Sequence, residues 1–466
     1  MRHNRIHLLS LVVLALGMLG AQFGMSAPAT LTPVPTQRPV ALSPQIPVGK
    51  PNQAIIAAAS PTAAAQERIV LKATVRDYTL AIDSPWRTAI SEMKKRHPNV
   101  DIQIEGRAYD DQRQKTLIAV GAGQGPDIVQ VDCIWLGEFA NGKILIDLSP
   151  YYATWKDAQD VPEAFLKSAQ FNGKYYGVWL NSDVRFLVWE KAAVKAAGLD
   201  PSVGPKTWDE LGAAAQKAQQ PPRLWGYGFP AASTDHTADR FYPLLWQGGG
   251  EILSPDYNKA AFNSAAGVAA LQFMTDLMNK YKVSPPDLMS TSEGDVTRAV
   301  DNGQYAYGIR VGPGAGADRF KTDVSKFTEL RGVAQLPVAP GGKPATGSGG
   351  WLLGISRDSK HPDLAWEFIT IVTDPANATP FWKINGMVPV RKSALGNIKE
   401  FETTFPYFGL VGQAVTITHF RPPVPAYNQL SPFIVTAIQK ALSRQATPKQ
   451  ALDEAAAAVD ALLSQR

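Results

Sequence analysis

The chain has 466 residues, which is long enough for two domains with hydrophobic cores of their own. Hydrophobic residues make up 45% of it and charged residues 19%, as in an ordinary soluble globular protein. The formal net charge of +5 is small and no basic run accompanies it, so the charge pattern argues against nucleic acid as a partner.

The N-terminus is typical of an export signal. Arg2 and Arg5 precede an apolar stretch over residues 8–19 that is too short to span a membrane. The Ala-Pro-Ala sequence at 27–29 is a suitable cleavage site, with Ala21 as an alternative, and residues 1–29 are predicted to be a signal peptide. We therefore expect an exported protein that is periplasmic or extracellular.

Residues 30–66 are rich in Pro, Ala, Thr and Gln and nearly uncharged, which predicts an extended linker. No Cys lies near the cleavage site, so a lipoprotein anchor is not expected, and membrane association would require a retained leader. The only cysteine is Cys133, which leaves no intrachain disulfide and no Cys-based metal cluster to expect. Because Cys133 follows a strand aspartate, we expect it to be a small buried hydrophobic residue.

Strands and helices alternate from Ile69 onward. Short apolar or alternating stretches predict strands, and amphipathic stretches bounded by Pro or Gly predict helices. Such an order favours a mostly parallel sheet covered by helices. The predicted elements are strands over 69–75, 100–105 and 128–133 and helices over 86–97 and 113–122.

Longer helices dominate the chain after Asp183. Thr207 is a good N-cap and Glu210 follows three residues later, which predicts a capping box at the start of one of these helices. The other predicted elements are helices over 265–281, 295–301, 362–372 and 448–464 and strands over 305–311 and 351–355.

Two aspartates are predicted to lie at strand ends. Asp132 is near the end of the strand 128–133, and Asp183 precedes a strand over 185–189. Burying an unpaired carboxylate is costly, so an aspartate at a strand end is expected to face a cleft rather than a core. With Trp135 and Trp179 nearby, these carboxylates suit a polyhydroxylated ligand.

Short segments spread along the chain follow a recognisable order. They include PDI at 126–128, FNGKYYGVWLNSDVRFLVWEK at 171–191, FYPLLWQGGG at 241–250, SGGWLLGIS at 348–356 and INGMVPVRKSAL at 384–395. Together they resemble family 1 of the extracellular solute-binding proteins, the maltose- and trehalose-binding group that serves ABC importers. There are departures: Trp179 replaces a usual Pro, Glu190 replaces a usual Asn, and the glycines of VGPGAG at 311–316 replace a Trp expected to stack on sugar.

The resemblance implies an α/β protein with the two-lobe periplasmic-binding-protein fold (type II) and a ligand cleft between the lobes. It further implies capture of a carbohydrate, a di- or oligosaccharide, by hinge closure, and delivery to the permease subunits of an ABC transporter. A monomer without cofactor or metal is expected. Lobe one would comprise residues 68–181 and 351–386, and lobe two residues 184–346 and 390–466, with crossings near 181–184, 345–350 and 388–391.

Three candidate ligand residues are expected at the cleft, and two of them, Asp132 and Asp183, match family positions. Asp132 and Asp183 would accept charge-assisted hydrogen bonds from sugar hydroxyls. The alternatives are a strand-end cap for Asp132 and an ion pair with Arg185 for Asp183. Trp351 follows two glycines and opens a strand, so its indole suits the C–H face of a pyranose, with ordinary packing as its alternative.

Three further candidates come from the other predicted lobe or a crossing. Tyr242 and Trp246 precede a glycine run and match the region where lobe two stacks on sugar. Arg391, in the sequence Pro-Val-Arg, could reach ligand hydroxyls or lock the crossing. By contrast, Trp366 and Trp382 lie on helix-like segments and are predicted to be core.

Two other classes of function stay open. Asp132 and Asp183 could act as the acid pair of a secreted polysaccharide-active enzyme. However, the six histidines are scattered without metal or triad spacing. In TGSGG at 346–350, Thr346 stands two residues before the serine, where a nucleophile elbow needs a glycine. A ligand-sensing subunit of a signalling system is the third possibility.

Overall fold

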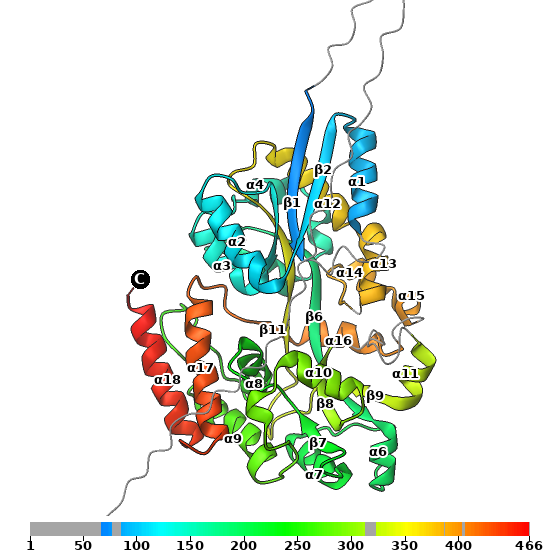
Figure 1. Ribbon diagram of the computed structural model, residues 1–466, viewed down its shortest axis with the longest axis vertical. Helices are drawn as coiled ribbons and strands as arrows, with labels where there is room; N and C mark the ends of the chain where they lie inside the picture. The colour runs from blue at the N-terminus through cyan, green and yellow to red at the C-terminus, as the bar shows by residue number, and fades with distance from the viewer. Residues whose placement is uncertain (1–66, 77–84, 313–322, 386, 403–405, 466) are drawn as a thin grey trace, which may run out of the picture. The chain divides into compact units, whose positions relative to one another are not determined.

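The computed structural model describes residues 67–76, 85–312, 323–385, 387–402 and 406–465 (Figure 1). The predicted signal peptide 1–29 and linker 30–66 lie outside the described residues. Within the described ranges, no helix combines the length and the apolar character needed to cross a bilayer.

The chain begins with the predicted alternation of strands and helices. Strand β1 (Ile69–Arg76) pairs in parallel with β2 (Val100–Arg107) along its whole length and with β3 (Ile128–Asp132) at Ala73 and Thr74. Helices α1 (Pro85–Arg96) and α2 (Tyr109–Gly121) connect these strands. The α/β class is thus confirmed in this region, with element ends that differ from prediction by a few residues.

One continuous strand, β6 (Val178–Glu190), runs through the middle of the sheet. Its first half pairs with β10 (Thr346–Ile355), and its second half pairs with β8 (Tyr305–Val311) and β9 (Arg331–Ala334). The sheet is completed by β7 (Trp225–Gly228), beside β8, and β11 (Thr418–Phe420), beside β10.

Asp183 therefore lies inside a strand, and its predicted position at a strand end is wrong. The residues between Leu180 and Arg185 contain no Gly or Pro that would stop the strand, and β10 supplies backbone partners on both sides of Asp183. Gly350, opposite Ser182, has φ +124°, and a β-carbon there would lie 2.4 Å from the carbonyl oxygen of Asn181. Glycine thus allows the two strands to stay close where their register shifts, next to Trp351.

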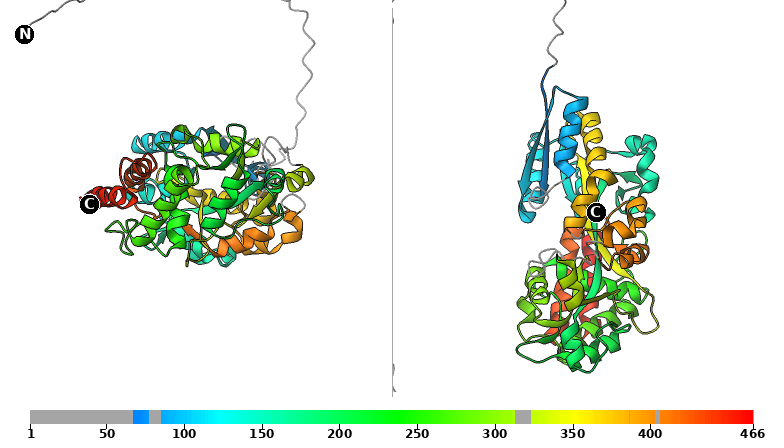
Figure 2. Two further views of the ribbon diagram at one scale, coloured as in Figure 1. Left: turned by 90° about the horizontal axis from the view of Figure 1, so that it is seen from below. Right: turned by 90° about the vertical axis from the view of Figure 1, so that its right-hand side faces the viewer.

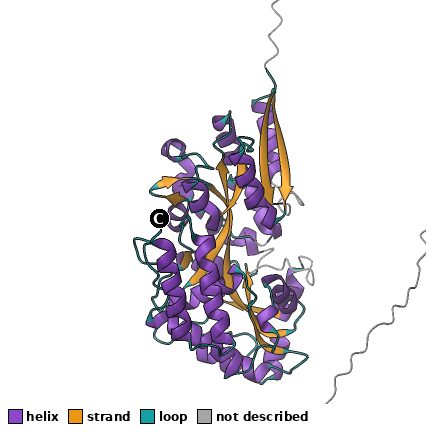
Figure 3. Ribbon diagram, turned by 60° about the vertical axis from the view of Figure 1, so that its left-hand side comes forward, coloured by secondary structure: helices purple, strands orange, loops and turns teal. Residues whose placement is uncertain are grey.

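Helices lie on both sides of the strands (Figure 3), and the last two, α17 and α18, pack against each other (Figure 2). A separate hairpin joins β4 (Gln170–Phe171) to β5 (Lys174–Tyr175). The remaining helices are α3 (Leu136–Asn141), α4 (Ser149–Thr154), α5 (Glu163–Ser168), α6 (Lys191–Ala196), α7 (Trp208–Ala218), α8 (Asp235–Gln247), α9 (Ala265–Asn279), α10 (Glu293–Asp301), α11 (Val324–Leu330), α12 (Pro362–Val372), α13 (Pro375–Asn385), α14 (Lys392–Gly396), α15 (Ile398–Glu402), α16 (Gly409–Thr416), α17 (Tyr427–Leu442) and α18 (Pro448–Leu463).

Helix α7 shows how the local sequence sets a helix start. Thr207 Oγ1 accepts a hydrogen bond from the backbone N–H of Glu210 at 3.2 Å, as the predicted cap requires. The Glu210 carboxylate, however, accepts from the N–H of Lys206 at 2.7 Å rather than from that of Thr207. The cap is confirmed, and the second bond of the predicted capping box is displaced by one residue.

Buried hydrophobic residues form two clusters. The smaller one lies around β1, α1 and α12 and includes the start of β6 and the end of β10, and the larger one contains most of the remaining buried hydrophobic residues. Cys133 is buried, as predicted for a small hydrophobic residue. Trp382 is fully buried, which confirms the prediction that it is core, whereas Trp366 is only half-buried.

Candidate ligand-binding site

Asp132 and Trp351 lie directly opposite each other on the antiparallel strands β3 and β10. Tyr109, the first residue of α2, and Trp135, in the short 3₁₀ turn after β3, complete an aromatic cluster with Trp351. The ring centroids are 5.2 Å apart for Tyr109 and Trp135, 5.9 Å for Tyr109 and Trp351, and 5.6 Å for Trp135 and Trp351. Tyr109 is 38% exposed, whereas Trp135 and Trp351 are 3% and 9% exposed, so Tyr109 supplies the solvent-exposed part of the aromatic cluster.

The carboxylate of Asp132 lies at the base of the aromatic cluster. One oxygen accepts from the N–H of Ile134 at 3.2 Å, and the other accepts from the Tyr109 hydroxyl at 3.1 Å. Burial raises the pKa of Asp132, and the nearby Arg421 and these two donors only partly offset it. Since each carboxylate oxygen has two acceptor sites, Asp132 keeps capacity for a further donor. Both predicted roles, strand-end cap and acceptor for a ligand, therefore fit one residue.

A cation already lies on the aromatic cluster. The guanidinium carbon of Arg76, at the end of β1, is 5.3 Å from the ring centroid of Tyr109 and 5.6 Å from that of Trp351. This distance is within the range of cation–π attraction. Arg76 also donates a hydrogen bond to the carbonyl of Arg107 at 3.2 Å.

Asp183 belongs to a chain of buried ion pairs, which we call the ionic chain. Arg185 contacts the carboxylate of Asp183 and also donates to Asp239 at 2.8 Å. Arg240 contacts Asp239 and donates to Glu293 at 2.5 Å. The ion pair with Arg185 that was the alternative for Asp183 is thus present. The Asp183 oxygen that Arg185 contacts, Oδ1, also accepts a hydrogen bond from the backbone N–H of Gly349 at 2.9 Å, two residues before Trp351.

Arg421 lies between the start of α8 and the end of β3. Its Nη1 donates to Asp235 at 2.6 Å, and its Nη2 is 4.0 Å from the sulfur of Cys133, next to Asp132. Asp235 also accepts hydrogen bonds from the hydroxyls of Tyr427, at 2.8 Å, and Ser431. Arg421, from the segment after β11, therefore joins the first residues of α8 to the end of β3.

Tyr242 is buried behind this arrangement. The hydroxyl of Tyr427 lies 3.3 Å from that of Tyr242, so Tyr242 reaches the carboxylate of Asp235 through one intervening hydroxyl. Burial raises the pKa of Tyr242, so its hydroxyl stays protonated. The described contacts place Tyr242 behind Asp235 rather than against the aromatic cluster.

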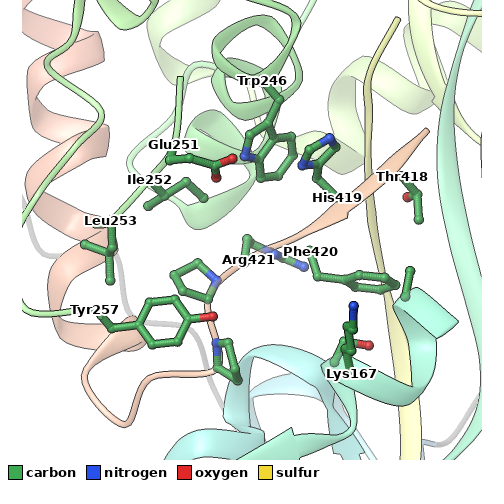
Figure 4. Close-up of a pocket in the computed structure, with 14 residues that line it drawn as sticks. Lys167, Trp246, Glu251, Ile252, Leu253, Tyr257, Thr418, His419, Phe420 and Arg421 are labelled. Atoms are coloured by element: carbon green, nitrogen blue, oxygen red, sulfur yellow. The ribbon is translucent and has the colours of Figure 1, made fainter. Parts of the chain in front are cut away.

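Trp246 lines a different cavity, of about 290 Å³, shown in Figure 4. Its ring stacks on His419 at a centroid distance of 5.1 Å and an angle of 18°. Other residues around this cavity are Lys167 of α5, Tyr257, Phe420 and Arg421. Arg421 is the residue that this cavity shares with the network around Asp132.

Arg391 is almost fully buried and lies among other partners. Its guanidinium donates to the carbonyl of Thr373 at 3.1 and 3.3 Å and to the hydroxyl of Thr373 at 3.2 Å. Its guanidinium carbon lies 4.6 Å from the ring centroid of Trp155. The described contacts of Arg391 include none of the other predicted ligand residues.

Of the six predicted residues, the structure brings Asp132, Asp183 and Trp351 together. Five further residues of the arrangement escaped the sequence analysis: Tyr109, Asp235, Asp239, Arg240 and Arg421. A signal was present for two of them. Asp239 and Arg240 are adjacent charged residues on a helical stretch that also contains Tyr242. Charged residues beside a large aromatic residue are not typical of a helix face that is fully exposed to solvent.

The arrangement suits binding of a polar ligand without net charge. Rings supply flat apolar faces, and the carboxylates and guanidiniums around them supply acceptors and donors for hydroxyl groups. Most of the charges are paired with each other, so a charged ligand would find few unpaired partners. The fold defines an α/β binding protein, and this candidate site lies where β3, β6 and β10 pair.

The chain belongs to the bacterial extracellular solute-binding protein family, whose profile matches residues 78–379. A solute-binding protein of an ABC transporter from Thermotoga lettingae, solved with alpha-D-tagatose, is 28% identical, and the match covers 85% of this chain and 100% of that one with a TM-score of 0.71. The maltose-bound MalE3 of T. maritima is 25% identical over 84% of this chain and 100% of its own, with a TM-score of 0.73. A probable amino-acid ABC transporter periplasmic-binding protein from Sinorhizobium fredii is 26% identical over 79% of this chain and 84% of its own.

These matches confirm the family and the periplasmic-binding-protein fold inferred from the sequence. They identify a family of binding proteins.

Proposed function

We propose that this protein is the substrate-binding component of an ABC importer and captures a carbohydrate for a membrane permease. The observation that carries the proposal is the Asp132 carboxylate at the base of the aromatic cluster of Tyr109, Trp135 and Trp351. Ring faces with a carboxylate at their edge match the apolar C–H faces and hydroxyl rim of a sugar. The sugars bound by the two Thermotoga proteins support the same ligand class.

We propose that the ligand contacts Asp132, Trp351 and Tyr109, and that Asp183 and Arg421 hold the surrounding charges. Direct contact with the ligand stays a prediction for Tyr242, Trp246 and Arg391. Tyr242 and Trp246 would influence the site through Asp235 and Arg421, respectively. Arg391 would act by holding Trp155 and Thr373.

Hinge closure between two lobes is part of the proposal, with the lobe boundaries at the three predicted crossings. Hydrogen bonds at Ser182 support it, since they tie the three crossing segments together. The backbone of Ser182 exchanges bonds of 3.1 and 2.8 Å with Val388, and its hydroxyl lies 2.8 Å from that of Ser348. A point where three crossings meet is a suitable pivot for a hinge.

The proposed setting is outside the cytoplasm, as a monomer that meets the permease subunits of its transporter. Membership of an extracellular solute-binding family supports this location. The proposal also holds that the protein binds and releases its ligand unchanged.

The test is a titration with neutral mono-, di- and trisaccharides, together with amino acids as charged competitors. A bound sugar at about 100 times its dissociation constant should stabilise the native state by about 2.7 kcal/mol, which raises the melting temperature. Closure on Trp351 should also change the tryptophan fluorescence. If only an amino acid produces these changes, the carbohydrate proposal is wrong, and if the sugar is converted to product, the binding-only proposal is wrong.

A further inference from the structure

A second cavity, which we call the side cavity, lies apart from the site described above. It has a volume of about 610 Å³ and opens between α1, the turn that leads into the 3₁₀ helix Lys156–Asp160, and the corner between α12 and α13. The residues that matter for its chemistry are Glu92, Arg96, Trp155, Asp157, Trp366 and Asp374. None of them belongs to the aromatic cluster, the ionic chain or the cavity of Figure 4. Its volume is within the usual range for small-molecule sites, about 300–1,000 Å³.

The local sequence puts these side chains on one surface. Glu92 and Arg96 are four residues apart on α1, so they project from the same face of the helix. Trp366 projects from α12, and Asp374 follows that helix and accepts the N–H of Ala376 at 2.9 Å, at the start of α13.

Two indole rings form a rigid corner in the side cavity. Trp155 and Trp366 meet edge to face, with centroids 5.6 Å apart and an angle of 86°. Tyr151 stacks on Trp366 at 5.1 Å, and the Arg391 guanidinium lies 4.6 Å from the ring centroid of Trp155. Both indoles are only half-buried. Since each ring is held by a neighbour, little side-chain entropy remains to be lost when a ligand stacks on the exposed part.

The charges of the side cavity nearly balance. Glu92 and Arg96 are paired at 2.9 Å. Lys156 and Asp157, both exposed, have no hydrogen-bond or ion-pair partner within the part of the chain that the structure describes. The lining thus offers both acceptors and donors without a strong excess of either sign. Such a lining fits hydroxyl groups better than a carboxylate, a phosphate or an ammonium group.

We propose that the side cavity is a second binding site, which takes a neutral oligosaccharide by stacking on the Trp155–Trp366 corner and hydrogen bonding to Asp157 and Lys156. This site would act independently of the site at Asp132, because the two share no residue. It would let the protein hold a sugar chain at a second point on its surface.

The experiment uses the full-length protein labelled with 5-fluorotryptophan, so that each indole gives its own fluorine resonance. Single Trp→Phe variants assign Trp155, Trp366 and Trp351. The probes are maltohexaose, cellohexaose and arabinohexaose, each titrated to millimolar concentration. The Trp351 resonance reports on the proposed function, and the other two resonances report on the side cavity, so failure of one proposal is distinguishable from failure of the other.

We expect at least one hexaose to move the Trp155 and Trp366 resonances along a common isotherm that differs from that of Trp351. Asp157→Ala should weaken that isotherm about tenfold or more, because it removes a charged hydrogen-bond acceptor. The matched control is Asp287→Ala, which removes an exposed aspartate without a side-chain partner among the described residues and outside the cavity, and it should change nothing. The proposal is overturned if no hexaose moves the two resonances, or if Asp157→Ala leaves their isotherm unchanged.

Discussion

Arg421 and Arg391 are both buried arginines beside aromatic rings, yet they have different partners. Arg421 pairs with the carboxylate of Asp235 and reaches the sulfur of Cys133 at the end of β3. Arg391 has no carboxylate within ion-pairing distance among the described residues, and it donates to Thr373 instead. Arg421 thus balances negative charge inside the proposed ligand site. Arg391 instead donates to the backbone of Thr373 and packs against the indole of Trp155.

This difference separates the proposed ligand site from the proposed structural clamp at Arg391, although both contain arginine beside tryptophan. The network around Arg421 includes Asp132, whose carboxylate keeps acceptor capacity beside partly exposed aromatic surface. Around Arg391, the carbonyl and the hydroxyl of Thr373 already accept hydrogen bonds from the arginine itself. The distinguishing feature is therefore unused acceptor capacity, which residue type alone does not reveal.

The largest expected effect comes from Arg421→Met. Removing one partner of a buried ion pair usually costs about 3–5 kcal/mol, because the other charge stays buried. Asp235 keeps two hydroxyl donors and its side chain is 25% exposed, so we expect the lower end, about 3 kcal/mol. Denaturant unfolding at neutral pH measures it.

The control for that experiment is Arg298→Met. The side chain of Arg298 is 69% exposed and pairs with Asp295 on the surface of α10, so its loss should change the unfolding free energy by less than about 1 kcal/mol. Equal losses for Arg421 and Arg298 would contradict the view that Arg421 balances buried charge.

Asp132→Ala should have the next largest effect, on ligand affinity. Hydrogen bonds to a charged group contribute about 1.5–3 kcal/mol, so binding of the sugar identified by titration should weaken by that amount. The fold should survive at neutral pH, because the loss of the bonds from Ile134 and Tyr109 is offset by the removal of a carboxylate whose pKa is raised by burial and whose charged form is therefore unfavourable. Calorimetry and unfolding on the same variant check both parts, and unchanged affinity with an intact fold would remove Asp132 from the site.

The sequence predicted the early alternation of strands and helices because local apolar patterns determine it. It also indicated Asp132 and Trp351 as candidate ligand residues, and these two residues prove to be directly paired across β3 and β10. By contrast, the sequence predicts Asp183 at a strand end. It does not show that β10 pairs with the first half of β6 and β8 with the second half, so that one strand continues across Asp183.

Arg421 escaped prediction for a similar reason. It stands in the segment His-Phe-Arg-Pro-Pro, which has neither helical nor strand periodicity, and its partners Asp235 and Cys133 are distant in the chain. Gly137 illustrates the same limit. A β-carbon there would lie 2.2 Å from the carbonyl oxygen of Pro423, so this glycine permits a close tertiary approach that no local pattern indicates.

The ionic chain should also make the free energy of unfolding depend on pH in the acid range. Burial alone would raise the pKa of Asp239, but Arg185 and Arg240 outweigh it and hold the pKa well below its usual range. The stability that Asp239 contributes is therefore present above its unfolded pKa, about 3.9, and is lost as the pH falls below that value.

Asp239→Asn should flatten this acid dependence. The unfolded chain binds one more proton than the native state in this range, so the slope should decrease by up to about 1.4 kcal/mol per pH unit. The slope is measured from unfolding free energies between about pH 5 and pH 2. It is read independently of how much unfolding free energy the variant loses at neutral pH. Asp209→Asn, on the exposed face of α7, is the control and should leave the slope unchanged. An identical slope in both variants would contradict the pairing of Asp239 with the two arginines.

Arg391→Met should have the smallest effect and completes the comparison with Arg421. The substitution loses the bonds to Thr373 and the contact with Trp155, which together favour the native state. It also removes a buried charge whose pKa is lowered by burial and whose Nη1 has no hydrogen-bond partner among the described residues. These contributions oppose each other, so we expect a net loss of only about 1 kcal/mol in unfolding free energy. Because Met fills similar space beside Trp155, affinity for the sugar should stay within about twofold. A loss of affinity as large as that of Asp132→Ala would instead make Arg391 a ligand residue, and the contrast between clamp and ligand site would then be wrong.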